Sequence, residues 1–477
     1  MSDAPTLSRR ARLTTWSSPG QLALVVIVLA APVAGANFLH TLVGFVDTRM
    51  VSHLGSEALA AMSVGRIGIW MIMSIFLGLG VGITAYVART TGAGEHERAR
   101  AYSTVGVIAG GVIGLLLMAI GLAVGSQPVQ MMVTSEVDGA LASGVTLTQR
   151  YAWEYMSIML IGLGGLGMQF STISVFNSLG RTVFPMWMLI ITNLANLLGN
   201  YLLIPRYEMA GCAWSTTITT ALVAVVGVFL LKKQGALTWN LKLLTSPVLK
   251  LWDMFKVGYP VTIQMSLRAI SMLAVIKLIT YLPESVIGQG ALHVGLQAES
   301  LAFMPAFAFS TAAATLVGQN IGAKQIGQAR TAALYCLAGS QAIMWTMALL
   351  FWLFAEGFIG IFIGSNNPEI LAPAAEFLRI LALCLPGLGV GMTMMGVLRG
   401  SGDTKITAWI TIAAMWVLRI PLIILLAFEG IGGSEIGFGY GLTGIWWAMT
   451  ISVYVEAALA YWRFATGKWA KVQLSKA

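Results

Sequence analysis

Long apolar runs constrain the fold of this chain more than any other feature. Each run is about 20 residues or longer, the length that a helix needs to cross the hydrocarbon core of a bilayer. Charged residues make up only 10% of the chain and hydrophobic residues 57%, which leaves too little polar surface for a soluble protein. We therefore predict an all-α polytopic membrane protein with twelve spans, near residues 22–48, 59–86, 101–124, 148–173, 184–204, 209–231, 254–281, 287–315, 331–354, 371–398, 406–428 and 441–464.

Short sequence patterns recur in the same order in both halves of the chain. The matched pairs are Pro32-Val33 with Pro260-Val261, Gly92-Ala93 with Gly322-Ala323, and Ala99-Arg100 with Ala329-Arg330. Repeated halves of apolar helices are a usual architecture of secondary transporters. We expect two pseudo-symmetric six-helix lobes, 22–231 and 254–464, joined by a cytoplasmic linker at 232–253 and flanked by cytoplasmic segments at 1–21 and 465–477.

The net charge of +9 reflects topology rather than binding to nucleic acid. If the N-terminus is cytoplasmic, the cytoplasmic segments hold twenty Lys and Arg residues and the opposite loops four. This positive-inside bias predicts that both termini are cytoplasmic. We expect the protein in the cytoplasmic (inner or plasma) membrane. Residues 21–36 resemble a signal peptide, but we expect a retained first helix because the apolar run continues to Val46.

Polar residues inside the apolar runs are the candidates for function. Asp47 lies near the outer end of the first span, where a carboxylate is costly unless it is paired, solvated or protonated. It is therefore a candidate for binding and releasing a proton, although pairing with Arg49 at the membrane surface would also explain it. Asn193, Asn196 and Asn200 share one face of the fifth span, where they either line a polar site or join helices by hydrogen bonds.

Three motifs resemble signatures of the multidrug and toxic compound extrusion (MATE) family. The first is Val46-Asp47-Thr48-Arg49-Met50-Val51; the others are residues 313–323, from Ala313 to Ala323, and 396–404, from Gly396 to Thr404. Together they cover the chain from about residue 22 to 460, in the family's order and with its number of helices. The resemblance implies two lobes around a central cavity and export of amphiphilic drugs coupled to inward flow of H⁺ or Na⁺.

The resemblance also implies roles for single residues. The aspartate that matches Asp47 is the coupling residue of the family, and it works with a bend at a proline that matches Pro32. In sodium-linked relatives the positions matching Asn196 and Asn200 are Asn and Asp, with a threonine near Thr216 or Thr217. Here Asn200 replaces the aspartate, which weakens a possible Na⁺ site at Asp47, Asn196 and Asn200 because an amide oxygen binds cations less well than a carboxylate does. We therefore expect H⁺ rather than Na⁺ as the coupling ion.

The second half carries a different set of deep polar residues, namely Gln264, Arg268, Glu299 and Arg419. One branch of the family has acids on helices seven and ten; this chain has Arg268 at the first position and no acid at the second. Charges at this depth are expected to pair, so we predict an ion pair between Glu299 and Arg268 or Arg419. Glu456 is either a second proton site or a solvated helix-end residue.

These features predict a secondary active exporter of amphiphilic, mainly cationic compounds that works as a monomer in the bilayer. We expect no enzyme activity, no cofactor, and no bound metal apart from that possible Na⁺. Nucleotide binding is rejected because neither glycine-rich stretch (Gly92–Gly94, Gly400–Gly402) follows a strand or has a Lys-Ser/Thr pair. A lipid or lipid-linked oligosaccharide flippase of the same wider superfamily is the main alternative, and a passive channel is a further one.

Overall fold

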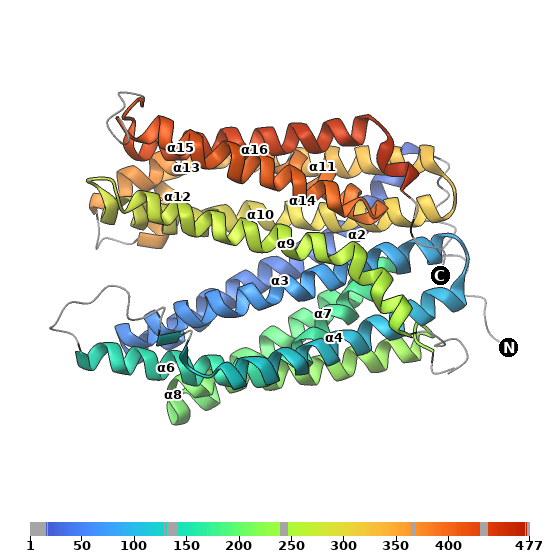
Figure 1. Cartoon of the computed structure of the whole chain (residues 1–477), viewed down its shortest axis with the longest axis horizontal. Coiled ribbons are helices and arrows are strands. Elements are labelled where there is room, and N and C mark those ends of the chain that lie inside the picture. Colours follow the sequence, from blue (N-terminus) through green and yellow to red (C-terminus); the bar gives the residue numbers. More distant parts are fainter. Residues whose placement is uncertain are drawn as a thin grey trace. The chain divides into compact units, whose positions relative to one another are not determined.

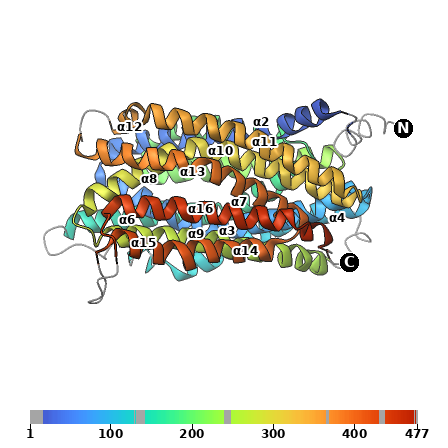
Figure 2. The same ribbon diagram turned by 90° about the horizontal axis from the view of Figure 1, so that it is seen from above.

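The computed structural model describes residue 16 and residues 18–127, 129–130, 142–238, 247–363, 368–429, 437–472 and 474. Within these ranges the regular structure is helical throughout (Figures 1 and 2). The helices are α2 (Pro19–Val51), η1 (Ser52–Leu54), α3 (Ser56–Gly92), α4 (His96–Val124), α6 (Ala142–Ile161), α7 (Leu163–Ser178), α8 (Val183–Lys233), α9 (Pro247–Ile279), α10 (Ser285–Gly322), α11 (Ile326–Leu353), α12 (Ala355–Ile363), α13 (Pro368–Ser401), α14 (Thr404–Ile412), η3 (Ala413–Arg419), α15 (Ile420–Ala427), α16 (Gly441–Ala465) and η4 (Lys468–Lys471). The predicted all-α class is confirmed.

The number of spans agrees with the sequence once two irregular helices are taken into account. Ten helices of the described residues are long and apolar enough to cross a membrane, and α6 with α7 forms an eleventh, bent by 55°. The 51-residue helix α8 covers two predicted spans and is interrupted at Glu208, whose φ of 49° and ψ of −126° are not helical. Counting α8 as two spans gives the twelve that were predicted.

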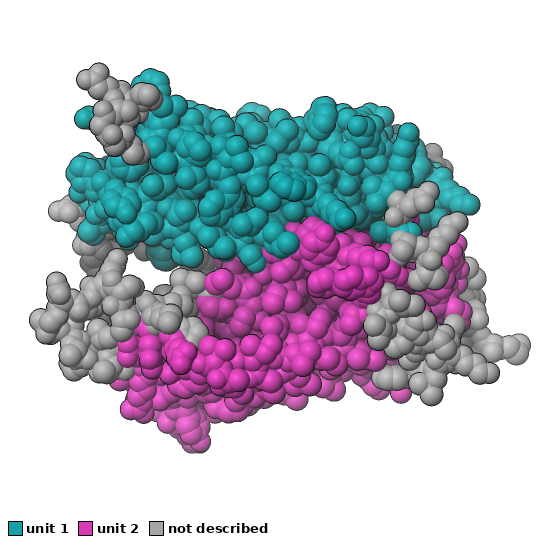
Figure 3. All heavy atoms as spheres, in the orientation of Figure 1, with its two compact units in different colours: residues 1–34, 263–474 teal, residues 35–262, 475–477 magenta. Residues whose placement is uncertain are grey.

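The chain divides into two compact units, which Figure 3 shows in different colours. Unit 1 holds the described residues up to Ala34 and those from Ile263 to Leu474, and unit 2 holds those from Gly35 to Thr262. The predicted lobes differ from these units in two places, because the first part of α2 belongs to unit 1 and the first part of α9 to unit 2. Both helices contain an internal proline near the boundary, Pro32 and Pro260.

Unit 1 contains two apolar clusters. One joins α9 (from Val275), α10, α13 and α16, with Phe377 and Trp446 in contact at its centre. The other packs the start of α2 against α10, α11 and α13, with Leu22 and Leu29 almost fully buried. Residues 19–34 of α2 therefore have their packing partners within unit 1.

Unit 2 depends on close contacts at small residues. Gly110 of α4 and Gly167 of α7 face each other, and a Cβ built on Gly167 would lie 2.2 Å from the Gly110 carbonyl oxygen. One turn further along α4, a Cβ on Gly114 would lie 2.2 Å from the Leu163 carbonyl oxygen. Helices without side chains at the contact can approach closely, which strengthens van der Waals packing where lipid supplies no hydrophobic driving force.

Candidate functional site

The carboxylate of Asp47 lies at the centre of a polar cluster in unit 2. Asn200 on α8 donates a hydrogen bond from Nδ2 to Asp47 Oδ1 over 2.7 Å. Asn200 is fully buried, so this bond joins a buried amide to a half-buried carboxylate. The distance is short for an N–H···O bond, as expected when the acceptor carries a charge.

Asn196 extends the cluster by one helical turn. Its amide is best oriented with the nitrogen toward Asp47, since the opposite orientation would place two oxygens 3.2 Å apart. In this orientation Nδ2 donates to Asp47 Oδ1, and the amide oxygen accepts from Thr216 Oγ1 at 3.0 Å and the Thr216 backbone N–H at 3.3 Å. Two amides thus donate to one carboxylate oxygen, and the second part of α8 holds one of them in place.

Three other residues were predicted for the site of the first lobe, namely Asn193, Thr217 and Pro32. Asn193 is buried one turn before Asn196 on the same face of α8. Thr217 points elsewhere, because its hydroxyl donates to the Ile158 carbonyl oxygen of α6 over 3.2 Å. Of the two threonines that the sequence proposed, the structure brings only Thr216 to the Asp47 cluster. Pro32 lies inside α2 but in unit 1.

Arg66 of α3 is the main cation acting on Asp47. Its guanidinium is exposed and donates to Thr48 Oγ1 at 3.2 Å and to the Gly44 carbonyl oxygen at 3.4 Å. In the part of the chain that is described, Asp47 forms no ion pair with Arg66 or with the neighbouring Arg49. Neutral amide donors rather than a paired cation therefore hold the Asp47 carboxylate.

No group of three or more His, Cys, Asp or Glu residues within the described ranges could hold a metal ion. The two amides of the Asp47 cluster direct their nitrogens toward the carboxylate, whereas a cation is bound by oxygens. The Oδ1 atom of Asn200 is buried and has no hydrogen-bond partner in the described structure. A rotation of this amide would exchange the donor that faces Asp47 for an acceptor.

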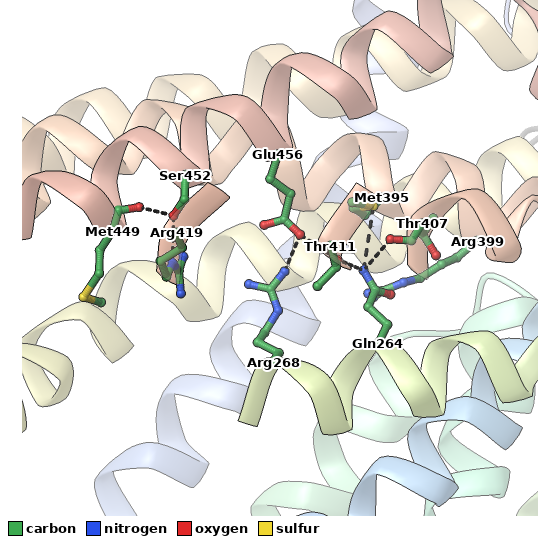
Figure 4. A network of polar contacts seen from close by, with 10 residues as sticks. All are labelled: Gln264, Arg268, Met395, Arg399, Thr407, Thr411, Arg419, Met449, Ser452 and Glu456. Atoms are coloured by element: carbon green, nitrogen blue, oxygen red, sulfur yellow. Dashed lines mark hydrogen bonds and ion pairs between the residues drawn. The ribbon is translucent and has the colours of Figure 1, made fainter. Parts of the chain in front are cut away.

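Unit 1 contains a second polar network, shown in Figure 4. Arg268 of α9 forms an ion pair with Glu456 of α16, with Nη2 and Oε1 2.6 Å apart. The same carboxylate oxygen accepts from Thr411 Oγ1 over 2.8 Å. Gln264 donates to Thr411 Oγ1 over 2.7 Å, and Arg399 donates to Gln264 Oε1 over 3.0 Å. The network therefore runs through α9, α13, α14 and α16.

This network corrects one sequence prediction. Glu299 was expected to pair with Arg268 or Arg419, but Arg268 pairs with Glu456, and Arg419 Nε donates to Ser452 Oγ over 2.7 Å. Glu456 is neither solvated nor at the surface, since only 5% of it is exposed. The prediction was wrong because equal depth along two helices does not tell which faces meet, and α16 rather than α10 presents its acid to Arg268.

Known proteins resemble this chain over nearly its whole length. The MatE family model matches residues 32–202 and 260–425. A "Probable multidrug resistance protein NorM" from Thermotoga maritima is 26% identical over 462 residues, covering 94% of this chain and 93% of the relative. A "Multidrug resistance protein NorM" from Burkholderia vietnamiensis is 28% identical, covering 91% and 92%.

A solved structure of a MATE protein in complex with MaL6 has the same fold, with a TM-score of 0.84 at 20% identity; the match covers 96% of this chain and 99% of the other. The family model covers well over half of the sequence, on both sides of the internal repeat. Members of this family are membrane transporters, so the chain is a transporter and not an enzyme. This chain belongs to the MatE family.

Proposed function

We propose that this protein exports amphiphilic compounds of several kinds, mainly cations, in exchange for protons that bind to Asp47. Multidrug resistance is the function named for the relatives from Thermotoga maritima and Burkholderia vietnamiensis. The observation that carries the coupling role is the Asp47 carboxylate itself, which is held by two amides of α8 and has no ion-pair partner in the described structure. A carboxylate without a fixed counter-charge can bind either a proton or a cationic ligand.

The hydrogen-bond directions support H⁺ over Na⁺ as the coupling ion. A sodium ion would need oxygen ligands, and both Asn196 and Asn200 turn nitrogens toward Asp47. A proton on Asp47 would instead turn the carboxyl group into a donor, and the unpartnered Oδ1 of Asn200 could accept from it after rotation of the amide. Protonation would thus replace one set of bonds between α2 and α8 by another.

In the proposed cycle a proton and a cationic substrate compete for the Asp47 carboxylate. A cationic substrate is attracted by the ionised Asp47, and a proton that enters from outside neutralises the carboxyl group and removes that attraction. The inward proton gradient then supplies the energy for export. We expect the protein to act as a monomer in the cytoplasmic membrane with both termini inside, as the distribution of basic residues indicates.

Proton flux in proteoliposomes tests this proposal. Addition of a cationic dye such as ethidium to vesicles that hold a proton gradient should release protons, and sodium should not be required. Dye transport that depends on Na⁺ alone would overturn the choice of ion. Absence of any dye-dependent flux from folded protein would overturn the exporter function and favour a flippase, which fluorescent lipid analogues would then detect.

A further inference from the structure

Arg419 is a buried cation that has no ion-pair partner in the described part of the chain. Only 5% of the residue is exposed, and its Nε donates to Ser452 Oγ over 2.7 Å. The Ser452 hydroxyl donates in turn to the Met449 carbonyl oxygen, so this contact supplies no negative charge. Within the described residues both Nη nitrogens lack a hydrogen-bond partner, and no carboxylate lies within ion-pair distance. Burial of such a charge is costly unless something else compensates it.

The backbone is built in a way that turns Arg419 into the interior. Residues Ala413–Arg419 form a π-helix between α14 and α15. In a continuous α-helix Arg419 would be rotated by about 80° from Thr411, eight residues earlier. The wider π turns advance less per residue and return Arg419 to the face of Thr411, which is itself fully buried. Such irregular turns are frequent at functional sites.

The surroundings of Arg419 carry excess positive charge. Figure 4 shows Arg268 directed at Glu456, with Arg419 on one side and Arg399 on the other. Arg268 is neutralised by Glu456, whereas Arg399, as far as the chain is described, is held only by the neutral Gln264, and its Nε is buried without a partner there. The remaining acid is Glu299, which acts electrostatically on both Arg268 and Arg419 but forms no ion pair among the described residues.

Three guanidinium groups thus face two carboxylates in this part of unit 1. The Asp47 cluster of unit 2 has the opposite polarity, with one carboxylate and neutral amides. The two halves of the repeat therefore share their helices but differ in the sign of their buried charge. Near the arginines of unit 1 a cation would be repelled and an anionic group would be stabilised.

We propose that Arg419, with Arg268 beside it, binds the carboxylate group of transported compounds. The planar guanidinium fork can donate two parallel hydrogen bonds to a carboxylate, and the free Nη nitrogens of Arg419 provide these donors. This inference rests on the proposed export function and deepens it, since it adds compounds that carry a carboxylate to the cationic substrates.

Binding of benzoate to the purified protein tests this site. Benzoate is compared with benzamide, which has the same shape and no charge, by isothermal titration calorimetry of wild type, Arg419→Gln and Arg419→Lys. Loss of a bidentate, charge-assisted contact should weaken benzoate binding by about tenfold or more. Arg419→Lys keeps the charge but loses the fork, so it should fold as wild type does and bind with intermediate affinity. Arg379→Gln is the matched control, because it removes an exposed arginine of the same unit and should bind benzoate as wild type does.

Three outcomes would overturn the assignment. Equal binding of benzoate and benzamide would show that the site does not recognise the charge of the ligand. Displacement of benzoate by an equal concentration of chloride would reduce the site to a general anion site. Unchanged benzoate binding by both Arg419 variants would place the carboxylate elsewhere. Wild-type transport of ethidium, measured in parallel, separates these failures from a failure of the export function itself.

Discussion

Replacement of Asp47 by asparagine is the sharpest perturbation of the proposed coupling site. The new side chain has the same shape but neither charge nor titrating proton. Two hydrogen bonds to Asp47, from Asn200 at 2.7 Å and from Asn196 at 3.2 Å, change from charge-assisted to neutral. Each such change is worth about 1 kcal/mol, so we expect a loss of about 2 kcal/mol in stability. This is small enough for the variant to fold.

The effect on coupling should be much larger than the effect on stability. Since a group that transfers protons contributes about 100-fold or more to the step that it serves, dye-driven proton release by Asp47→Asn should fall to the leak of empty vesicles. The assay is the pH change inside proteoliposomes after addition of ethidium, at matched protein content. Glu154→Gln is the control, because it makes the same chemical change at an ion-paired acid of unit 2. Normal proton release by Asp47→Asn would refute the reasoning.

Three further substitutions test other parts of the structure. Asn200→Asp places a second carboxylate 2.7 Å from Asp47, so the pair should share a proton or bind a cation; transport measured with and without Na⁺ should become stimulated by sodium, and identical rates would contradict this. Asp403→Asn breaks a largely buried ion pair of 2.7 Å and should lower the unfolding free energy by about 3 kcal/mol. Glu95→Gln, which breaks an exposed pair, should lower it by less than about 0.5 kcal/mol. Gly167→Ala would place Cβ 2.2 Å from a backbone oxygen and should lower the unfolding temperature, with a cost of about 1–3 kcal/mol; Gly327→Ala, which has open space, should not, and equal temperatures would show that the close contact is not required.

The helices could be predicted from sequence because their cause is local. A run of about 20 apolar residues must satisfy its own backbone hydrogen bonds in lipid, and only a helix does so. The break in α8 at Glu208 falls between the predicted spans 184–204 and 209–231, but the positive φ that this residue adopts was not predictable from a local pattern. The division of α2 between two compact units also depends on packing that no local pattern contains.

The two polar sites show where sequence reasoning ends. Asn196 and Asn200 were recognised because they lie four residues apart on one helix, and the family resemblance linked them to Asp47. No comparable guide existed for Arg268, whose partner Glu456 is 188 residues away. Contacts between distant helices depend on how each helix is rotated, and depth in the membrane carries no information about that rotation. Glu456 was noticed in the sequence, but only the structure identifies what it binds.

The π-helix at Ala413–Arg419 has a consequence for comparing relatives of this protein. A widened turn of this kind stores one extra residue without breaking the helix. Removal of that residue would leave seven residues between the positions of Thr411 and Arg419, and an α-helix of that length turns by about 700°, so that the arginine would stay within about 20° of the same face. A relative that lacks the extra residue can therefore present its side chain on the same face and at the same depth, although an alignment without a gap would pair Arg419 with a different residue. Gap placement, and not only residue identity, should be examined when substrate preferences within the family are compared.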